Sequence, residues 1–335
     1  MIESPENSYP PPPPVKAKST WKKVGIGCGI ALIVFICCAA LGVVAYLERD
    51  KIPGLESLFS GMSSSSGGNQ IAFTSYRNGE GDIFLINSDG TGEAQLTSEA
   101  SNDTDAEWSP NGKKIAFTSD RGGNNDIYLM NADGSNVIRL TNDDADDASP
   151  AFSPDGTFIA FLSNRNGNYE IHVMNADGSN VRVVINLPNS ADLDPAWSPD
   201  GNQIIFASGI NNEINLWRIN SNGTNLTQLT FDDSISWFPT WCGTTGLVAF
   251  ETNRYGDSFS DFDIVTMQPN GTDQTRLTLT TTNDSFPDWS SDGSRLVFVS
   301  NRDSNFELYI MNVDGSNIVR LTNNTVDDGA PAWKP

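Results

Sequence analysis

Short runs in which hydrophobic and polar residues alternate recur from residue 70 to the C-terminus. These runs are too short for helices, and they predict strands because alternate side chains of a strand point to opposite faces of a sheet. Asp-Gly and Asn-Gly pairs separate the runs and tolerate the positive φ of tight hairpin turns. One unit has four runs, which predict a four-stranded antiparallel sheet: Ala151–Phe152, Phe158–Leu162, Glu170–Met174 and Val181–Ile185.

The unit is repeated along the chain with a nearly constant period. A glycine closes an Asn- or Asp-rich turn in each unit, with spacings of 44, 44, 45, 48 and 44 residues, at Gly90, Gly134, Gly178, Gly223, Gly271 and Gly315. A period in the forties built of short strands predicts a propeller or a solenoid. No unit contains an apolar run with the 3.6-residue spacing of a helix, so helical repeats are excluded.

Two strands of each unit carry an aromatic residue at a fixed position. The second strand has Phe73, Phe117, Phe161, Phe206, Phe250 and Phe298, and the innermost strand has Trp108, Phe152, Trp197, Trp241, Trp289 and Trp333. The two series are out of phase, because the first unit begins at Gln70 without an innermost strand and the chain ends on a spare one. The C-terminal strand is therefore predicted to complete the first blade, which leaves no sheet edge open.

The repeated motifs also resemble a known family. Pro-x-Trp-Ser-Pro-Asp-Gly, Ile-Ala-Phe-x-Ser-x-Arg and Ile-Tyr-x-Met-Asn-x-Asp-Gly are similar to the WD40-like PD40 repeat of TolB-type propellers over about residues 69–335. The resemblance implies an all-β, six-bladed β-propeller of four-stranded antiparallel blades at residues 70–335. It is less specific for function, because such propellers serve as partner platforms, as protease gates and as parts of enzymes.

The first 69 residues differ in composition from the repeats. Residues 1–23 include the run Pro10 to Pro14 and predict a disordered cytoplasmic tail. Val24 to Leu47 contains no charged residue and is long enough as a helix to cross a hydrocarbon core of about 30 Å, so it predicts one transmembrane helix. Four lysines precede it, which places the tail inside and the propeller outside the cytoplasm. Residues 48–69 are Ser- and Gly-rich and predict a flexible stalk.

The charge of the repeats excludes one class of partner. The whole chain carries −22, and residues 52–335 contain 14 Lys and Arg against 38 Asp and Glu, or −24. Such a domain repels phosphate backbones, so no nucleic-acid partner is expected.

The residues needed for most hydrolytic and metal chemistry are scarce. The chain has one histidine, His172, at a third-strand position where the other units have aromatic or apolar residues, so we expect it to be packed in the core. No Gly-x-Ser-x-Gly motif is present. The repeats contain one cysteine, Cys242, which is expected to be a buried structural thiol. The sequence therefore predicts that the protein is not an enzyme and has no catalytic or metal-binding residues.

Two charged series recur with the blades. Five residues before each innermost-strand aromatic are Asp103, Asp147, Asp192, Ser236, Asp284 and Asp328, and four residues after each second-strand phenylalanine are Arg77, Arg121, Arg165, Ile210, Arg254 and Arg302. We call the loop that leaves each unit and leads to the next innermost strand its exit loop. The unit that has Ile210 instead of arginine is followed by the loop that has Ser236 instead of aspartate. This joint absence favours an Arg–Asp pair across each exit loop, such as Arg121 with Asp147.

The same aspartates have a second interpretation. They are expected to form a ring at one mouth of the channel, where they would contact a partner or hold a cation, for which Ca²⁺ is the candidate cofactor. Further acidic residues have no arginine partner in this scheme and keep the mouth negative: Asp105, Asp143, Asp144, Asp146, Asp194 and Asp327.

These observations predict a single-pass, membrane-anchored, extracytoplasmic propeller in the cell envelope that binds a protein or peptide. The alternative function is a sensor or binding domain for a small ligand or a cation at the channel mouth. A hydrolase or lyase is disfavoured by the histidine count.

Overall fold

The computed structural model describes residues 69–186, 190–210, 213–231, 233–256 and 261–335. The predicted tail, the membrane segment Val24–Leu47 and the stalk up to residue 68 lie outside these ranges. Within them, no helix has the length and apolarity needed to cross a bilayer.

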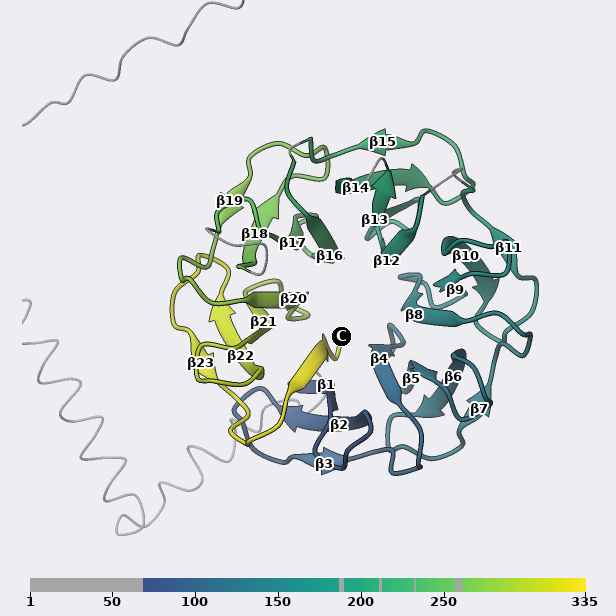
Figure 1. Ribbon diagram of the computed structural model, residues 1–335, viewed down its shortest axis with the longest axis horizontal. Coiled ribbons are helices and arrows are strands. Elements are labelled where there is room, and N and C mark those ends of the chain that lie inside the picture. The colour runs from purple at the N-terminus through teal and green to yellow at the C-terminus, as the bar shows by residue number, and fades with distance from the viewer. Residues whose placement is uncertain (1–68, 187–189, 211–212, 232, 257–260) are drawn as a thin grey trace, which may run out of the picture. The chain divides into compact units, whose positions relative to one another are not determined.

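The described residues form six four-stranded antiparallel sheets arranged around a central axis (Figure 1). Blade 1 consists of β24 (Asp328–Trp333), β1 (Gln70–Ser75), β2 (Asp82–Asn87) and β3 (Ala94–Gln95). Blade 2 consists of β4 (Asp103–Trp108), β5 (Lys114–Ser119), β6 (Asp126–Asn131) and β7 (Ile138–Arg139). Blade 3 consists of β8 (Asp147–Phe152), β9 (Phe158–Ser163), β10 (Glu170–Asn175) and β11 (Arg182–Val183).

The remaining three blades follow in chain order. Blade 4 consists of β12 (Asp192–Trp197), β13 (Gln203–Ile210), β14 (Glu213–Asn220) and β15 (Thr227–Gln228). Blade 5 consists of β16 (Ser236–Trp241), β17 (Val248–Thr252), β18 (Asp263–Met267) and β19 (Thr275–Arg276). Blade 6 consists of β20 (Asp284–Trp289), β21 (Arg295–Ser300), β22 (Glu307–Asn312) and β23 (Val319–Arg320). The predicted number of blades and strands is confirmed.

Closure of the ring occurs in blade 1, as the sequence predicts. The C-terminal strand β24 pairs antiparallel with β1, and Trp333 lies opposite Ile71. Trp333 is 4% exposed and packs in a cluster that joins blade 1 to blade 6. The last strand therefore pairs with the first strand and also fills the core at the seam.

The core lies between neighbouring blades and not inside any one of them. The phenylalanine of each second strand is fully buried at Phe73, Phe117, Phe161, Phe206, Phe250 and Phe298. The innermost tryptophans add polar links between blades, since Trp108 Nε1 donates to the Ala332 carbonyl at 3.2 Å and Trp197 Nε1 donates to the Ala151 carbonyl at 3.1 Å. Each blade consequently depends on its neighbours for burial.

The turn glycines make the close approach of blades possible. Gly178 has φ of 88°, and a Cβ at this position would lie 2.7 Å from the Leu140 carbonyl oxygen of the preceding blade. Any side chain would therefore strain the turn and also separate two blades.

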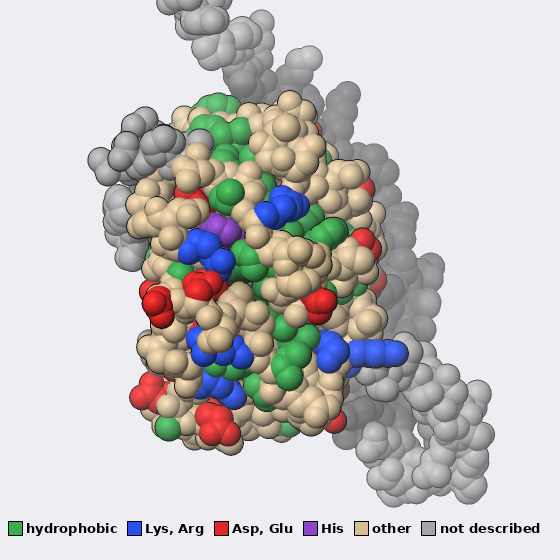
Figure 2. Space-filling model, turned by 90° about the vertical axis from the view of Figure 1, so that its right-hand side faces the viewer, with side chains coloured by type: hydrophobic (Ala, Val, Ile, Leu, Met, Phe, Trp, Pro, Cys, Tyr) green, Lys and Arg blue, Asp and Glu red, His purple; other side chains and the backbone are tan. Residues whose placement is uncertain are grey.

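The outer rim has a mixed surface. Figure 2 shows one side of it, where Lys and Arg side chains lie among acidic and hydrophobic ones. On this side, charges of both signs are interspersed, so the surface seen here has no field of a single sign.

Ring closure leads to a stability prediction. Deleting residues 327–335 removes β24, opens an edge of β1 and removes a buried tryptophan, so it should cost about 3 kcal/mol or more of unfolding free energy. Deleting Pro335 alone is the matched control and should leave the melting temperature nearly unchanged. Equal melting temperatures for the two truncations, measured by circular dichroism, would reject closure by β24.

Candidate functional site

Each innermost strand has a bulge where it faces the channel. The register with the second strand shifts there in all six blades. At each bulge one non-glycine residue has φ between 43° and 52°, at Asp105, Ser149, Asp194, Phe238, Phe286 and Ala330. A bulge bends the strand and re-aims its side chains. The positive φ is sterically costly for non-glycine residues, so these positions are strained.

The channel contains two chambers on opposite sides of these bulges. The hairpin-side chamber has a volume of about 510 Å³ and is lined by all six innermost strands. The loop-side chamber has a volume of about 460 Å³ and is lined mainly by blades 1, 5 and 6. Asp105, Phe238, Phe286 and Ala330 line both chambers and therefore form the boundary between them. The Phe238 and Phe286 rings narrow this boundary, with centroids 4.0 Å apart.

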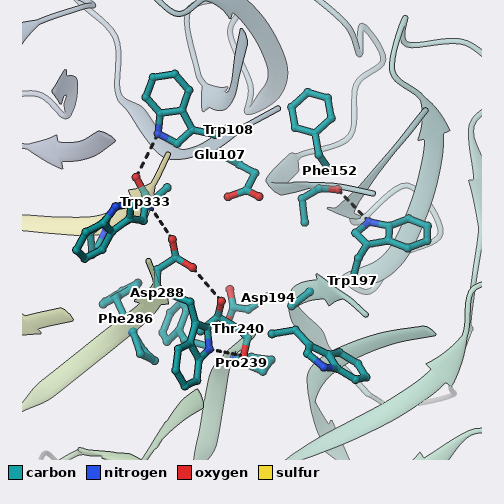
Figure 3. A pocket seen from close by; sticks show the side chains of 18 of the residues that line it. Glu107, Trp108, Phe152, Asp194, Trp197, Pro239, Thr240, Phe286, Asp288 and Trp333 are labelled. Atoms are coloured by element: carbon teal, nitrogen blue, oxygen red, sulfur yellow. Dashed lines mark hydrogen bonds between the residues drawn. The ribbon is translucent and has the colours of Figure 1, made fainter. Parts of the chain in front are cut away.

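Both chambers are acidic and aromatic. No Lys, Arg or His is among the residues lining either of them in the described part of the chain. In the hairpin-side chamber, Glu107, Asp194 and Asp288 lie around the central space between tryptophan side chains (Figure 3). Asp288 is held in place, because it accepts hydrogen bonds from the Trp333 backbone N–H at 2.6 Å and from Thr240 Oγ1 at 2.9 Å.

The channel carboxyl groups are poorly solvated. Burial raises the pKa of Asp194 to about 8, with a further contribution from the charge of Asp105. Burial likewise raises the pKa of Asp288 to about 6. The pKa of Glu107 is raised well above its ordinary value by burial and by the charge of Asp288. These groups lack nearby counter-charges, so the channel favours either protons or a positively charged ligand.

The predicted Arg–Asp pairs exist, but within blades. Arg121 Nη2 lies 2.7 Å from Asp103 Oδ2, and Arg121 Nε donates to Ser119 Oγ at 2.9 Å. The equivalent distances are 3.0 Å for Arg165–Asp147, 2.8 Å for Arg302–Asp284 and 3.4 Å for Arg77–Asp328. Four arginines therefore attach the start of an innermost strand to the second strand of the same blade.

This geometry corrects the partners assigned from the sequence. Arg121 binds Asp103 and not Asp147, because Asp103 lies opposite Ser119 in the antiparallel register and Arg121 follows two residues later. The replacements at Ile210 and Ser236 thus fall in different blades. In blade 4, Asp192 accepts a hydrogen bond from Ser208 Oγ at 2.7 Å. In blade 5, Ser236 donates to Thr252 Oγ1 at 3.1 Å, and Arg254 donates to Gln274.

The predicted aspartate ring at the channel mouth is also corrected. Asp103, Asp147, Asp192, Asp284 and Asp328 are 0–1% exposed, and of these only Asp328 lines a chamber. The physical reason is the strand geometry: the first side chain of the strand points into its blade, and the bulge two residues later faces the channel. Asp105 and Asp194, which the sequence left without arginine partners, occupy such bulges.

Comparison with known proteins identifies the fold family. The PD40 family model, described as the TolB β-propeller domain, matches residues 45–242 and 144–286, which is more than half of the chain. The chain belongs to the TolB β-propeller family.

Solved structures support the TolB fold. TolB from Acinetobacter baumannii is 24% identical with a TM-score of 0.69, and the match covers 80% of this chain and 67% of that one. A putative TolB from Agrobacterium tumefaciens is 18% identical with a TM-score of 0.63, covering 81% and 100%. An oligogalacturonate lyase in complex with manganese is 16% identical with a TM-score of 0.52, covering 76% and 74%. A search of curated proteins found no match.

Blade 5 has two residues at the channel that no other blade has. Trp237 occupies the innermost-strand position that is Thr104, Ala148, Leu193, Ser285 or Gly329 in the other blades. Glu251 occupies the second-strand position that is Thr74, Thr118, Leu162, Ala207 or Val299. Neither position is constant among the other blades, so the fold does not require a particular residue there, and the indole and the carboxyl group are local features of blade 5. The same comparison between repeats would have identified Glu107, Asp288 and Glu251, which sequence reasoning missed.

Glu251 is a buried carboxyl group at the centre of this exception. It is 2% exposed and accepts hydrogen bonds from Trp237 Nε1 and from the Phe286 backbone N–H, the latter at 2.8 Å. Burial raises its pKa to about 8 despite these donors. Trp237 in turn stacks on Phe262, with ring centroids 5.5 Å apart.

The two residues expected to be structural are packed in the core. His172 is 2% exposed, and its ring centroid lies 5.8 Å from that of Phe161 on the neighbouring strand. Burial lowers its pKa, which favours the neutral ring. Cys242 is a free, fully buried thiol. Across the described ranges, no group of three or more His, Cys, Asp or Glu side chains is placed to hold a metal ion.

The Arg–Asp geometry is tested by two double-mutant cycles. Arg121→Ala with Asp103→Ala should show a coupling of about 0.5–2 kcal/mol, because both changes remove the same partly buried ion pair. Arg121→Ala with Asp147→Ala is the matched control and should be additive. Urea unfolding measures both cycles, and coupling confined to the second pair would restore the sequence-based assignment.

The raised pKa of Glu251 predicts a dependence of stability on pH. The folded pKa of about 8 lies above the unfolded value near 4.5, so this contribution is fully present below about pH 4.5 and is lost as the pH rises through about 8. Glu251→Gln should therefore reduce the fall in unfolding free energy between pH 5 and pH 8. Asp89→Asn is the control, because hydrogen bonds from Thr91 lower the pKa of this exposed group and it stays ionised throughout that range. Parallel pH profiles for wild type and Glu251→Gln would contradict the buried-acid interpretation.

Proposed function

We propose that this TolB-family chain is a membrane-anchored, extracytoplasmic propeller that binds a protein or peptide partner with the loops around blade 5. The family and the fold support a protein-binding role in the cell envelope. The uncharged run Val24–Leu47, with lysines before it, supports the anchor and its orientation. The protein acts in this proposal as a scaffold and not as an enzyme.

The observation that carries the proposal is the exposure of large apolar residues beside blade 5. Phe231 is 76% exposed and Leu279 is 75% exposed, and each follows a Leu-Thr pair in the loop between two blades. The other interblade loops have a polar residue at this position, at Ser98, Asn142, Asn186 and Asn323. Exposed apolar side chains at two adjacent interblade loops are typical of interaction surfaces.

A third residue lies at the same end of blade 5. Tyr255 is 41% exposed and follows Arg254 in the loop between β17 and β18. The register places Ser236 opposite Thr252 and Thr252 opposite Asp263. The loops that carry Phe231 and Tyr255 therefore lie at the same end of the strands of blade 5. We call Phe231, Tyr255 and Leu279 the blade-5 surface. This apolar surface lies on a strongly acidic domain. A partner with apolar residues for the surface and basic residues around them would therefore be complementary to it.

Cation sensing is the second candidate function, supported by the carboxyl groups of the channel. Ca²⁺ remains the inorganic candidate because it prefers carboxylate oxygens. The enclosed position of these groups in aromatic chambers favours a different class of ligand.

Photo-cross-linking in native membranes tests the partner-binding role. A photoreactive amino acid at Tyr255 of the full chain should capture a defined protein, and the same residue at Val137 near the rim strand β7 should not. Phe231→Asn with Leu279→Asn should lower the yield about fivefold or more, because the apolar contact is lost. Ile138→Asn on β7 is the matched apolar-to-polar control and should leave the yield unchanged.

Two outcomes would contradict the proposal. Equal capture from Tyr255 and Val137 would show that the blade-5 surface has no special role. Capture of a cytoplasmic protein would contradict the extracytoplasmic orientation.

A further inference from the structure

The loop-side chamber has an aromatic wall. Trp237, Phe238 and Phe262 come from blade 5, and Phe286 and Phe306 come from blade 6. The rings contact one another, because Trp237 stacks on Phe262 and Phe238 lies against Phe286. The faces of such rings carry negative electrostatic potential and attract cations, while their area accommodates an apolar body.

Carboxyl groups face this wall without a counter-charge. Asp105 and Glu251 line the chamber, and no basic side chain is among its described lining residues. Asp105 accepts hydrogen bonds from Thr104 and Thr118, and Glu251 accepts them from Trp237 and Phe286, so neutral groups alone hold both acids. Burial raises the pKa of both groups, as expected for carboxyl groups without a positive charge beside them.

A buried hydroxyl group without a partner is a second, independent feature of the chamber. Thr74 is 2% exposed and lines the chamber, and its Oγ1 has no hydrogen-bond partner among the described residues. The equivalent residue of blade 2, Thr118, donates to Asp105 and accepts from the Ser149 backbone N–H. A buried hydroxyl without a partner is unfavourable, and a hydrogen-bonding ligand in the chamber would satisfy it.

We propose that the loop-side chamber binds an organic cation, namely a protonated amine carried on an aromatic or aliphatic body. The body packs against Trp237 and Phe238, the ammonium group faces Asp105 and Glu251, and Thr74 accepts a hydrogen bond from the ligand. The site is distinct from the blade-5 surface and does not depend on it. A free amine and the lysine side chain of a bound protein offer the same chemistry.

Titration calorimetry with phenethylamine at pH 8 tests this proposal. The amine should bind at least about tenfold more tightly than the neutral 2-phenylethanol, and phenylacetate should not bind, because only the amine supplies positive charge. N-acetyl-lysine methylamide is the probe for a lysine side chain. Tighter binding of this probe than of phenethylamine favours a protein side chain as the source of the cation, and the reverse order favours a free amine.

Two variants locate the site. Thr74→Val removes the hydroxyl group but loses no hydrogen bond within the protein, so it should fold normally and bind the amine several-fold more weakly. Asp105→Asn should lower amine affinity about tenfold or more. Asp288→Asn in the hairpin-side chamber is the matched control and should bind as wild type.

Three results of these binding measurements would overturn the proposal. Equal binding of the amine and the alcohol would show an apolar cavity without cation recognition and would overturn the proposal. No binding of any probe at millimolar concentration would also overturn it, as would equal loss of affinity in Asp105→Asn and Asp288→Asn.

Discussion

The antiparallel pairing of β24 with β1 closes the ring of blades. Without this pairing, blade 1 has no innermost strand and the seam with blade 6 loses Trp333. The channel would then be open on one side, because Ala330 and Trp333 line the hairpin-side chamber. Closure thus stabilises the ring and also encloses the acidic channel groups. The raised pKa values of those groups follow from this enclosure.

The residues that pack neighbouring blades together are repeated in every blade, whereas residues at the channel differ between blades. Phenylalanines on the second strands and glycines in the turns are repeated because each is needed where two blades meet. Blade 5 retains these features, with Phe250 fully buried and Gly271 close to the Leu229 carbonyl oxygen. Its departures at Trp237 and Glu251 are at the channel, where Trp237 packs on the core between blades 4 and 5 and Glu251 accepts a hydrogen bond from the Phe286 N–H of blade 6.

The Arg–Asp pairs illustrate a limit of reasoning from co-occurrence. Ile210 replaces the arginine of the repeat and Ser236 replaces the aspartate, and the two are close in sequence. This closeness suggested that a single Arg–Asp pair is missing. The register shows that β12 pairs with β13 and that β16 pairs with β17, so Ile210 belongs to the sheet of Asp192 and Ser236 belongs to the next sheet. Each blade instead compensates separately, through Ser208 in blade 4 and through Thr252 in blade 5.

The strands of the propeller, their number and the closing strand could be predicted from the sequence alone. Alternation, Asp-Gly turns and a fixed period are local properties, and the spare strand at Trp333 follows from counting them. Two of the channel acids, Asp105 and Asp194, were also recognisable as residues without an arginine partner. The tertiary structure decided which side chains meet, because a bulge on each innermost strand turns the third residue to the channel and leaves the first inside the blade. The chamber around Glu251 and Thr74 joins blades 1, 5 and 6, which are distant in sequence and come together only when the ring closes.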